Sequence, residues 1–279
     1  MMNLLRKLIS AIKPKPQVFV AKGCFSPWYS SEYWRDKSHV TNIDESIPCQ
    51  ATVACKGVTD MSSMFNTCSK LTSIDLSNFN TSKVDDMEWM FTNCRNLTAL
   101  DLSNFDTSNV TAMIGMFCNC FRLTTLDLSS FDTSNVTDMD KMFASCYSLT
   151  KLDLSNFNTS KVVCMSWMFD YCDKLTSIDL SNFYTSNVFT MYAMFSECHS
   201  LTELDLSSFD TSKVINMSYM FDNCPRLTTI KGVIDMKSCE YCGNMFTNCP
   251  KLTGVKIKNP PSGFETHACI SKSQYTIVS

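Results

Sequence analysis

One segment of 26 residues recurs along this chain, and this repeat constrains the fold more than any other feature. Met-Phe pairs mark it: their methionines are spaced 26 residues apart from Met64 to Met220, and the next follows 25 residues later at Met245. A period of roughly 20–50 residues indicates stacked units that bury a continuous core between neighbours. The chain is therefore predicted to form a solenoid in which each repeat makes one coil.

Two columns of the repeat alignment are predicted to form ladders in the core. Identical side chains at this period lie above one another, about 4.7–4.9 Å apart, as on neighbouring strands. The cysteine column comprises Cys68, Cys94, Cys120, Cys146, Cys172, Cys198, Cys224 and Cys249. The phenylalanine column comprises Phe79, Phe105, Phe131, Phe157, Phe183 and Phe209. Each coil is thus expected to present the same core to the next.

Each repeat combines a strand-like pattern with a pattern typical of a tight return arm. The pattern L-x-x-I-x-L beginning at Leu71 matches the core of leucine-rich repeats, and Asp75 points outward between two of its buried positions. It predicts a strand. The pattern V-x-x-M-x-x-M beginning at Val84 has a spacing of three, which suits a 3₁₀-like or irregular arm.

The repeat as a whole, C-x-x-L-T-x-L-D-L-S-x-F-x-T-S-x-V-x-x-M-x-x-M-F, resembles that of the BspA-like bacterial surface proteins, a leucine-rich-repeat relative also found in mycoplasma lipoproteins. The resemblance extends from about Val58 to Lys258. It implies a β-rich, right-handed leucine-rich-repeat-like solenoid of about seven 26-residue repeats, with a cap at each end. It also implies a module that binds other macromolecules, often as an adhesin.

Composition divides the chain into four segments. Residues 1–16 are predicted to form an amphipathic helix and a proline linker, and residues 17–57 an N-terminal cap. Residues 58–258 form the solenoid and residues 259–279 a C-terminal cap, because the ends of a solenoid need covers. The helix either covers the next domain or docks to a larger assembly or membrane surface. The aromatic residues of 17–57 either cover the first coil or form a binding patch.

Charge and hydropathy exclude several classes of function. Charged residues make up 18% of the chain and the net charge is −3, so nucleic acid is not an expected partner. No apolar run is long enough to span a membrane. The apolar stretch from Leu8 to Ile12 is too short for a signal peptide, so none is expected. The predicted location is a cell surface or a virion by family resemblance, and otherwise the cytoplasm.

The sixteen cysteines are interpreted as structural thiols. Stacked cysteines point the same way, and cysteine is readily buried, so a reduced ladder is favoured over disulfides. Cys239 and Cys242 form a C-x-x-C, a spacing that also occurs in redox and zinc sites. In the repeat alignment, however, Cys239 and Cys242 both fall in core columns of the arm. A zinc site would also need Cys249 or His267 to lie close to them. No metal and no cofactor is predicted.

An aspartate column on the outward side of the strand pattern requires an explanation. It comprises Asp75, Asp101, Asp127, Asp153, Asp179 and Asp205. Stacked carboxylates repel one another, so hydroxyl or backbone N–H donors must stabilise them, or a row of cations must bind there. Two threonine columns, which begin at Thr72 and Thr81, resemble the hydroxyl arrays of ice-binding solenoids, but they lie nine residues apart and on different faces.

Nothing in the sequence indicates catalysis. The three histidines, His39, His199 and His267, belong to no Ser-His-Asp, HExxH or nucleophile-elbow pattern, and no phosphate-binding loop is present. The chain is therefore predicted not to be an enzyme.

The variable columns of the arm become aromatic and aliphatic in the later coils, which predicts a binding face. Packing of these side chains between coils is the alternative. The candidate residues are Trp89, Val163, Trp167, Tyr171, Tyr184, Phe189, Tyr192, Ile215 and Tyr219.

Together these features predict a non-catalytic recognition or adhesion module that binds a protein or glycan on a cell surface. The alternative is a structural component of a larger assembly, such as a phage virion or tail appendage, anchored to neighbouring subunits through residues 1–16. The sequence does not define the oligomeric state.

Overall fold

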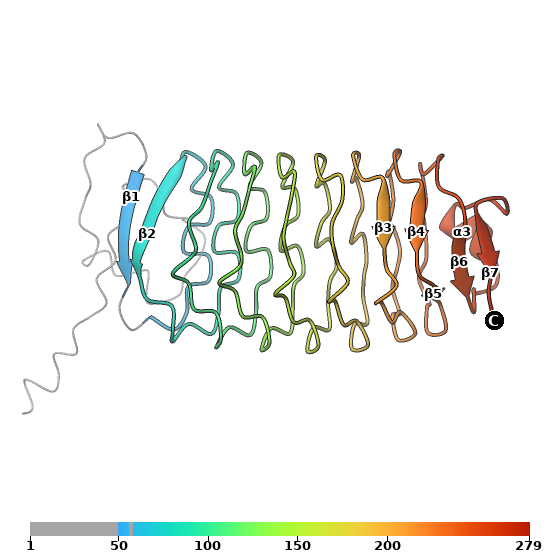
Figure 1. Ribbon diagram of the computed structural model, residues 1–279, viewed down its shortest axis with the longest axis horizontal. Coiled ribbons are helices and arrows are strands. Elements are labelled where there is room, and N and C mark those ends of the chain that lie inside the picture. Colours follow the sequence, from blue (N-terminus) through green and yellow to red (C-terminus); the bar gives the residue numbers. More distant parts are fainter. Residues whose placement is uncertain (1–49, 56–57) are drawn as a thin grey trace, which may run out of the picture.

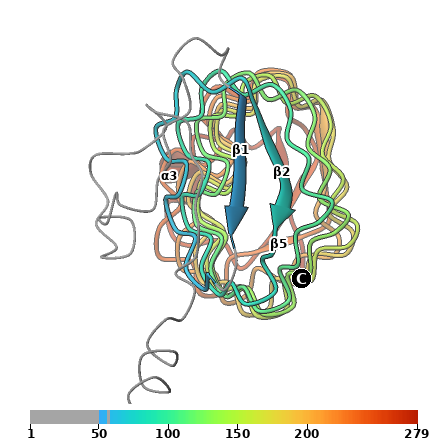
Figure 2. The same ribbon diagram turned by 90° about the vertical axis from the view of Figure 1, so that its left-hand side faces the viewer.

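The chain winds into a stack of similar coils in the computed structural model, which describes residues 50–55 and 58–279 (Figure 1). Seen along the stack, the coils lie one behind another around a common core (Figure 2). This is the repeat solenoid that the period predicts. The expected helix at 1–16, and the aromatic residues Trp28, Tyr29, Tyr33 and Trp34 of the expected cap, lie outside the described residues.

Parallel pairing joins the strands of neighbouring coils. Strand β1 (Gln50–Cys55) pairs with β2 (Ser73–Phe79), and β3 (Glu203–Asp205) pairs with β4 (Thr229–Lys231). Three further strands, β5 (Ile234–Asp235), β6 (Val255–Lys258) and β7 (Tyr275–Ile277), form a parallel sheet in that order. One short helix, α3 (Phe264–Ala268), lies between β6 and β7 in the chain.

The expectation of a regular strand in every coil is wrong. Between the end of β2 and the start of β3 the L-x-x-L-x-L segments are extended but form no regular strand. There the N–H of Thr124 lies 3.5 Å from the carbonyl oxygen of Thr98, beyond the usual range for this bond. On this side of the core the Phe105 and Phe131 rings stack with centroids 6.5 Å apart. Since sheet spacing is about 4.8 Å, these rings keep the segments too far apart for regular pairing.

The return arms are rows of turns that are joined into a ladder. In one arm Trp89 donates its N–H to the carbonyl of Ile114 in the next coil (2.7 Å), whereas Thr92 donates its N–H locally to the carbonyl of Trp89 (3.1 Å). Alternate amides thus serve the neighbouring coil and the local turn. Single parallel bridges connect every arm to the next, through Asp60, Asp86, Ala112, Asp138, Cys164, Thr190, Asn216 and Tyr241.

These turns place two residues of each arm in the left-handed region of backbone conformation, with φ between 52° and 65°. The first position is held by Ser63, Trp89, Gly115, Lys141, Trp167, Ala193, Tyr219 and Asn244, and the second by Thr67, Asn93, Asn119, Ser145, Tyr171, Glu197, Asn223 and Asn248. This conformation costs roughly 1–2 kcal/mol for most residues other than glycine. The ladder bonds and the core contacts therefore have to offset that cost in every coil.

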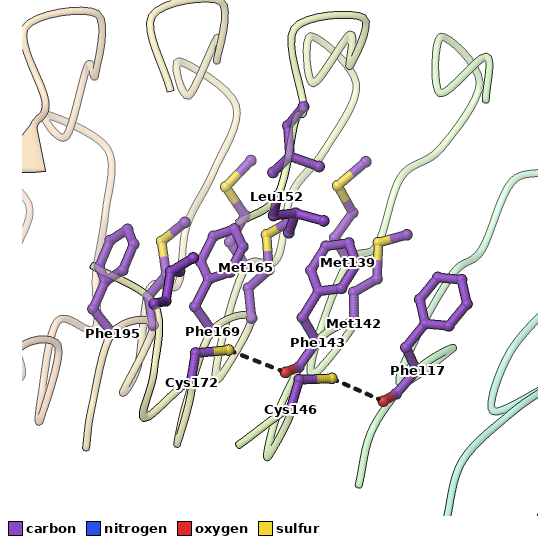
Figure 3. Packing of buried hydrophobic residues seen from close by; sticks show 14 of the residues in the cluster. Phe117, Met139, Met142, Phe143, Cys146, Leu152, Met165, Phe169, Cys172 and Phe195 are labelled. Atoms are coloured by element: carbon purple, nitrogen blue, oxygen red, sulfur yellow. Dashed lines mark hydrogen bonds between the residues drawn. The ribbon is translucent and has the colours of Figure 1, made fainter. Parts of the chain in front are cut away.

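The core consists of columns of identical side chains (Figure 3). The rings of Phe117, Phe143 and Phe169 stack with centroids 5.8 and 5.7 Å apart. Beside them the buried Cys146 donates its S–H to the carbonyl of Phe117 at 3.3 Å, and Cys172 does the same to Phe143 at 3.4 Å. Burial holds the pKa of these thiols far above the ordinary value. The ladder cysteines Cys120, Cys146, Cys172 and Cys198 therefore act as apolar fillers with one weak hydrogen bond to the preceding coil. The last two, Cys224 and Cys249, also interact with each other.

The threonine column that begins at Thr81 is buried, so its hydroxyls form no outward array. It comprises Thr81, Thr107, Thr133, Thr159, Thr185 and Thr211, all at most 2% exposed. The hydroxyl of Thr133 donates to the carbonyl of Asn158 (3.0 Å) and accepts the N–H of the same residue (2.8 Å). Each hydroxyl thus satisfies both backbone groups of one residue in the next coil.

Residues 259–279 continue the ladder past the last repeat. Asn244 and Phe246 donate their N–H groups to the carbonyls of His267 and Ala268, at 2.7 and 2.9 Å. The ring of Phe264 packs edge-on against Tyr275, with centroids 5.4 Å apart. Helix α3 therefore accepts the arm bonds that another coil would accept. In the described residues, no helix is sufficiently long and apolar to cross a membrane.

We expect the substitution Thr133→Val to lower the free energy of unfolding by about 2 kcal/mol. Valine keeps the shape but leaves the N–H and C=O of Asn158 without their partner, and unmade buried bonds cost about 1–3 kcal/mol. Chemical denaturation measures the loss. The control is Thr137→Val, since Thr137 is exposed and should change stability by less than about 0.5 kcal/mol. Equal losses in the two variants would contradict the bridging role of the buried hydroxyl.

Candidate interaction surface

The outward side of three consecutive arms carries most of the predicted binding residues. We call the outward side of residues 163–172, 189–198 and 215–224 the arm face. Trp89 lies in an earlier arm, and Tyr184, 63% exposed, precedes the arm of its own coil. The other candidates lie on the arm face: Val163, Trp167, Tyr171, Phe189, Tyr192, Ile215 and Tyr219.

An apolar row, formed by Val163, Phe189 and Ile215, lies at the start of the three arms. Phe189 donates its N–H to the carbonyl of Val163 (3.0 Å), and Ile215 donates to Phe189 (2.9 Å), so the three are direct neighbours. Phe189 is 48% exposed and Ile215 40%. The row continues into Tyr241, which is 57% exposed and bonds through its N–H to Ile215 (3.1 Å). Tyr241 was missed because it lies one position beyond this column, in which Glu240 follows Ile215.

The neighbouring aromatic residues are only partly exposed and pack against each other. We call Trp167, Tyr192 and Tyr219 the aromatic wall. Trp167 meets Tyr192 edge-on at 4.6 Å between centroids, and Tyr192 lies 5.5 Å from Tyr219. The ammonium of Lys141, in the preceding coil, lies 3.8 Å from the centre of the Trp167 ring. Packing between coils, the second interpretation of these positions, therefore accounts for the wall, and the apolar row remains available for binding.

Trp89 also packs between coils. A Cβ placed on Gly115, the next residue of its column, would overlap the Trp89 ring. Gly115 has a φ of +56°, which glycine adopts without strain. The glycine therefore makes room for the indole, and the pair acts as a local packing unit.

Three carboxylates form an acidic row beside the wall: Asp170, Glu197 and Asp222. The pKa of Asp170 is raised to about 7. Burial is the largest cause and the charges of Glu197 and Asp222 add to it, whereas a hydrogen bond with Ser196 and the charge of Lys141 oppose the shift. Burial and the charge of Glu197 also raise the pKa of Asp222. In the described part of the chain, no lysine or arginine forms a salt bridge with these three groups.

A hydrogen-bonded chain holds Glu197 in place. Its Oε2 accepts from the side-chain amide of Asn223 at 2.5 Å and lies 3.2 Å from Nε2 of His199. The other ring nitrogen of His199 lies 2.5 Å from Oδ1 of Asp173. Both ring nitrogens of His199 are thus occupied by neighbouring acidic side chains. The sequence signal for this group was present in the two variable columns that follow each Met-Phe pair.

One ion pair on the preceding coil shows how this surface holds an ammonium group. Nζ of Lys141 lies 2.7 Å from Oδ2 of Asp140 while it covers the Trp167 ring. Burial raises the pKa of Asp140, and the bond from Lys141 opposes that shift. A cation is therefore stabilised by a carboxylate and an aromatic ring together.

The aspartate column on the strand side is stabilised locally. Oδ1 of Asp101 accepts the N–H of Ser103 at 3.0 Å and its hydroxyl at 2.6 Å, and these bonds lower the pKa of the carboxyl. Asp75, Asp127, Asp153, Asp179 and Asp205 accept the corresponding N–H. The predicted backbone and hydroxyl donors are therefore present.

The C-x-x-C pair lies in core columns of the arm. Cys239 and Cys242 are 8% and 4% exposed, and a hydrogen bond between the two thiols raises the pKa of Cys239. Neither Cys249 nor His267 completes a metal-binding group with them, as no cluster of three metal-ligating residues occurs in the part of the chain described. The geometry fits the interpretation as core packing.

Comparison with known proteins identifies one family. The family model described as "Mycoplasma protein of unknown function, DUF285" matches residues 38–151 and 147–259, well over half of the chain. The predicted resemblance, which included mycoplasma proteins, is confirmed by this match. No curated protein matches the sequence.

Two solved structures are distantly similar. A leucine-rich cell surface protein from Faecalibacterium prausnitzii A2-165 is 16% identical with a TM-score of 0.28, over 82% of this chain and 75% of that chain. A leucine-rich repeat protein from Bacteroides ovatus ATCC 8483 is 15% identical with a TM-score of 0.23, over 85% of this chain and 97% of that chain.

We expect Gly115→Ala to lower the free energy of unfolding by about 1–2 kcal/mol, because the new methyl group displaces the Trp89 ring. Ala193 occupies the same column with a φ of 52°, so the backbone tolerates a Cβ there. Urea denaturation of the single variants and of the double variant with Trp89→Ala forms a cycle. The decrease in unfolding free energy caused by Gly115→Ala should largely disappear in the Trp89→Ala background. If the decrease is unchanged there, backbone strain and not the Trp89 ring is responsible.

The substitution Asp170→Asn should stabilise the protein at pH 8 by roughly 2 kcal/mol and change little at pH 4. Since the pKa is raised on folding, the folded state binds more protons than the unfolded state between the two pKa values, and stability falls as the pH rises toward 7. Asparagine removes that penalty. Thermal melts at several pH values test this, with Asp101→Asn as the control. Its lowered pKa predicts the opposite sign, a loss at pH 8.

Proposed function

We propose that this chain, which belongs to the DUF285 family of mycoplasma proteins, is a non-catalytic recognition module that contacts another macromolecule through its arm face. One observation supports this most directly: the apolar row lies exposed on a scaffold whose core columns repeat almost unchanged. Phe189 and Ile215 are 48% and 40% exposed. Contiguous exposed apolar side chains are typical of interaction sites.

The apolar row marks one part of the solenoid rather than all of it. In the earlier coils the same column holds Asp85, Thr111 and Thr137, which are polar. A polar residue at this position is thus compatible with the fold, so the scaffold does not require Phe189 there. Covering its exposed ring would stabilise a complex by about 25 cal/mol per Å² of apolar surface removed from water.

The histidine environment supports a non-catalytic role. His199 contacts Asp173, Glu197 and Asn223, and in the described residues no serine, threonine or cysteine side chain bonds to its ring. General-base activation of a nucleophile needs such a contact. Because both ring nitrogens of His199 contact carboxylates, the arrangement fits a histidine that orders the surface.

The partner and the location are part of the proposal. The partner is a protein or glycan on a cell surface, and the module is displayed on a cell surface or a virion, as the resemblance to BspA-like proteins implies. The assembly alternative depends on residues 1–16, which lie outside the described residues.

The double substitution Phe189→Ser and Ile215→Ser should weaken binding to cells at least about tenfold, because it removes the centre of the apolar row. Labelled protein is titrated onto cell panels and glycan arrays, and circular dichroism verifies that the variant is folded. The control is Val233→Ser with Ile277→Ser, two residues that are 38% and 64% exposed away from the arm face. Binding that is unaffected by the first pair, or lost equally with the second, would refute the assignment of the arm face.

A further inference from the structure

Three stripes of different chemistry cross the arm face side by side. Along each arm the chain passes first through the apolar row, then the aromatic wall and then the acidic row, as in Phe189, Tyr192 and Glu197. Ladder bonds join adjacent arms, so each stripe advances by about 4.8 Å per coil. A ligand that lies across the three coils therefore meets an apolar stripe and an acidic stripe in parallel.

Among the described residues, the acidic stripe has no lysine or arginine paired with it. Its strongest described cationic neighbour is Lys141, which already pairs with Asp140 and lies over Trp167. Glu197 is held by amide and imidazole nitrogens, and no described lysine or arginine pairs with Asp170 or Asp222. The stripe thus concentrates negative charge that a partner can compensate.

We propose that the arm face docks a segment of another protein in which an apolar row lies beside a row of lysine or arginine side chains. The proposal rests on the function proposed above and names the class of partner. Its apolar side chains cover Val163, Phe189 and Ile215, and its cationic groups reach the acidic row. Charge complementarity of this kind selects partners and orients them on a flat surface.

One observation favours a protein partner over a neutral glycan. A neutral glycan would leave the charge of Asp170, Glu197 and Asp222 uncompensated. A lysine or arginine of the partner would contact carboxylates next to aromatic rings at this stripe. The same combination of a carboxylate and an aromatic ring already holds Lys141.

The test uses the full chain and two synthetic amphipathic peptides of the same length, one built from leucine and lysine and the other from leucine and glutamate. Fluorescence anisotropy gives each dissociation constant at low and at high salt. We expect the lysine peptide to bind, with an affinity that falls at high salt, and the glutamate peptide to bind at least about tenfold more weakly.

Two triple variants with the same change in charge locate the binding. The first variant removes the acidic row and should raise the dissociation constant of the lysine peptide at least about tenfold. It combines Asp170→Asn, Glu197→Gln and Asp222→Asn. The second variant is the control and removes three carboxylates from the strand side: Asp101→Asn, Asp127→Asn and Asp153→Asn. Asparagine can still accept the hydrogen bonds of the turns there. This control should bind as the unmodified protein does.

Specific outcomes overturn the inference. Equal loss in both triple variants, or equal binding of the two peptides, would mean that net charge or nonspecific apolar contact explains the result. If neither peptide binds while a neutral glycan does, and Phe189→Ser abolishes that glycan binding, the protein partner is refuted but the recognition function stands. If the Phe189 and Ile215 substitutions leave cell binding unchanged, the recognition function itself fails.

Discussion

Hydrogen bonds between neighbouring coils are the interaction on which the rest of this structure depends. The return arm turns so tightly that only alternate amides find a partner within the coil, as the bond from Thr92 to Trp89 illustrates. The remaining amides must donate to the next coil, as Trp89 does to Ile114. A single coil would leave these groups unpaired, which costs free energy when they are buried. The stack is consequently stable as an array and not as separate units.

The 26-residue period was sufficient to predict the stack and its core columns, because burial at one position recurs in every coil. Regular strands could not be predicted coil by coil, since a ring separation such as that of Phe105 and Phe131 decides whether the amides approach closely enough. The bridging role of the buried column that includes Thr133 was not predicted. The partner of Thr133, the backbone of Asn158, is 25 residues away in the chain.

The candidate site was predicted in part. The columns of the repeat alignment predicted the apolar row. The prediction also included Trp167 and Tyr192 in the same binding face as Phe189, because a sequence does not show which rings face solvent and which pack against one another. The acidic row was missed because Asp170 and Glu197 belong to two different columns. They become neighbours only when successive arms are stacked, where the charge of Glu197 acts on Asp170.

The uniformity of the contacts between coils has a consequence for inheritance. Thr107, Thr133 and Thr159 each bond to a residue 25 positions later in the chain, and Cys146 and Cys172 each bond to one 29 positions earlier. Because these junctions are built alike, unequal recombination between two of these copies of the repeat deletes or inserts a whole coil and leaves each junction complete. The solenoid can thus change length in one genetic step, and the outward stripes become longer or shorter while both ends stay the same.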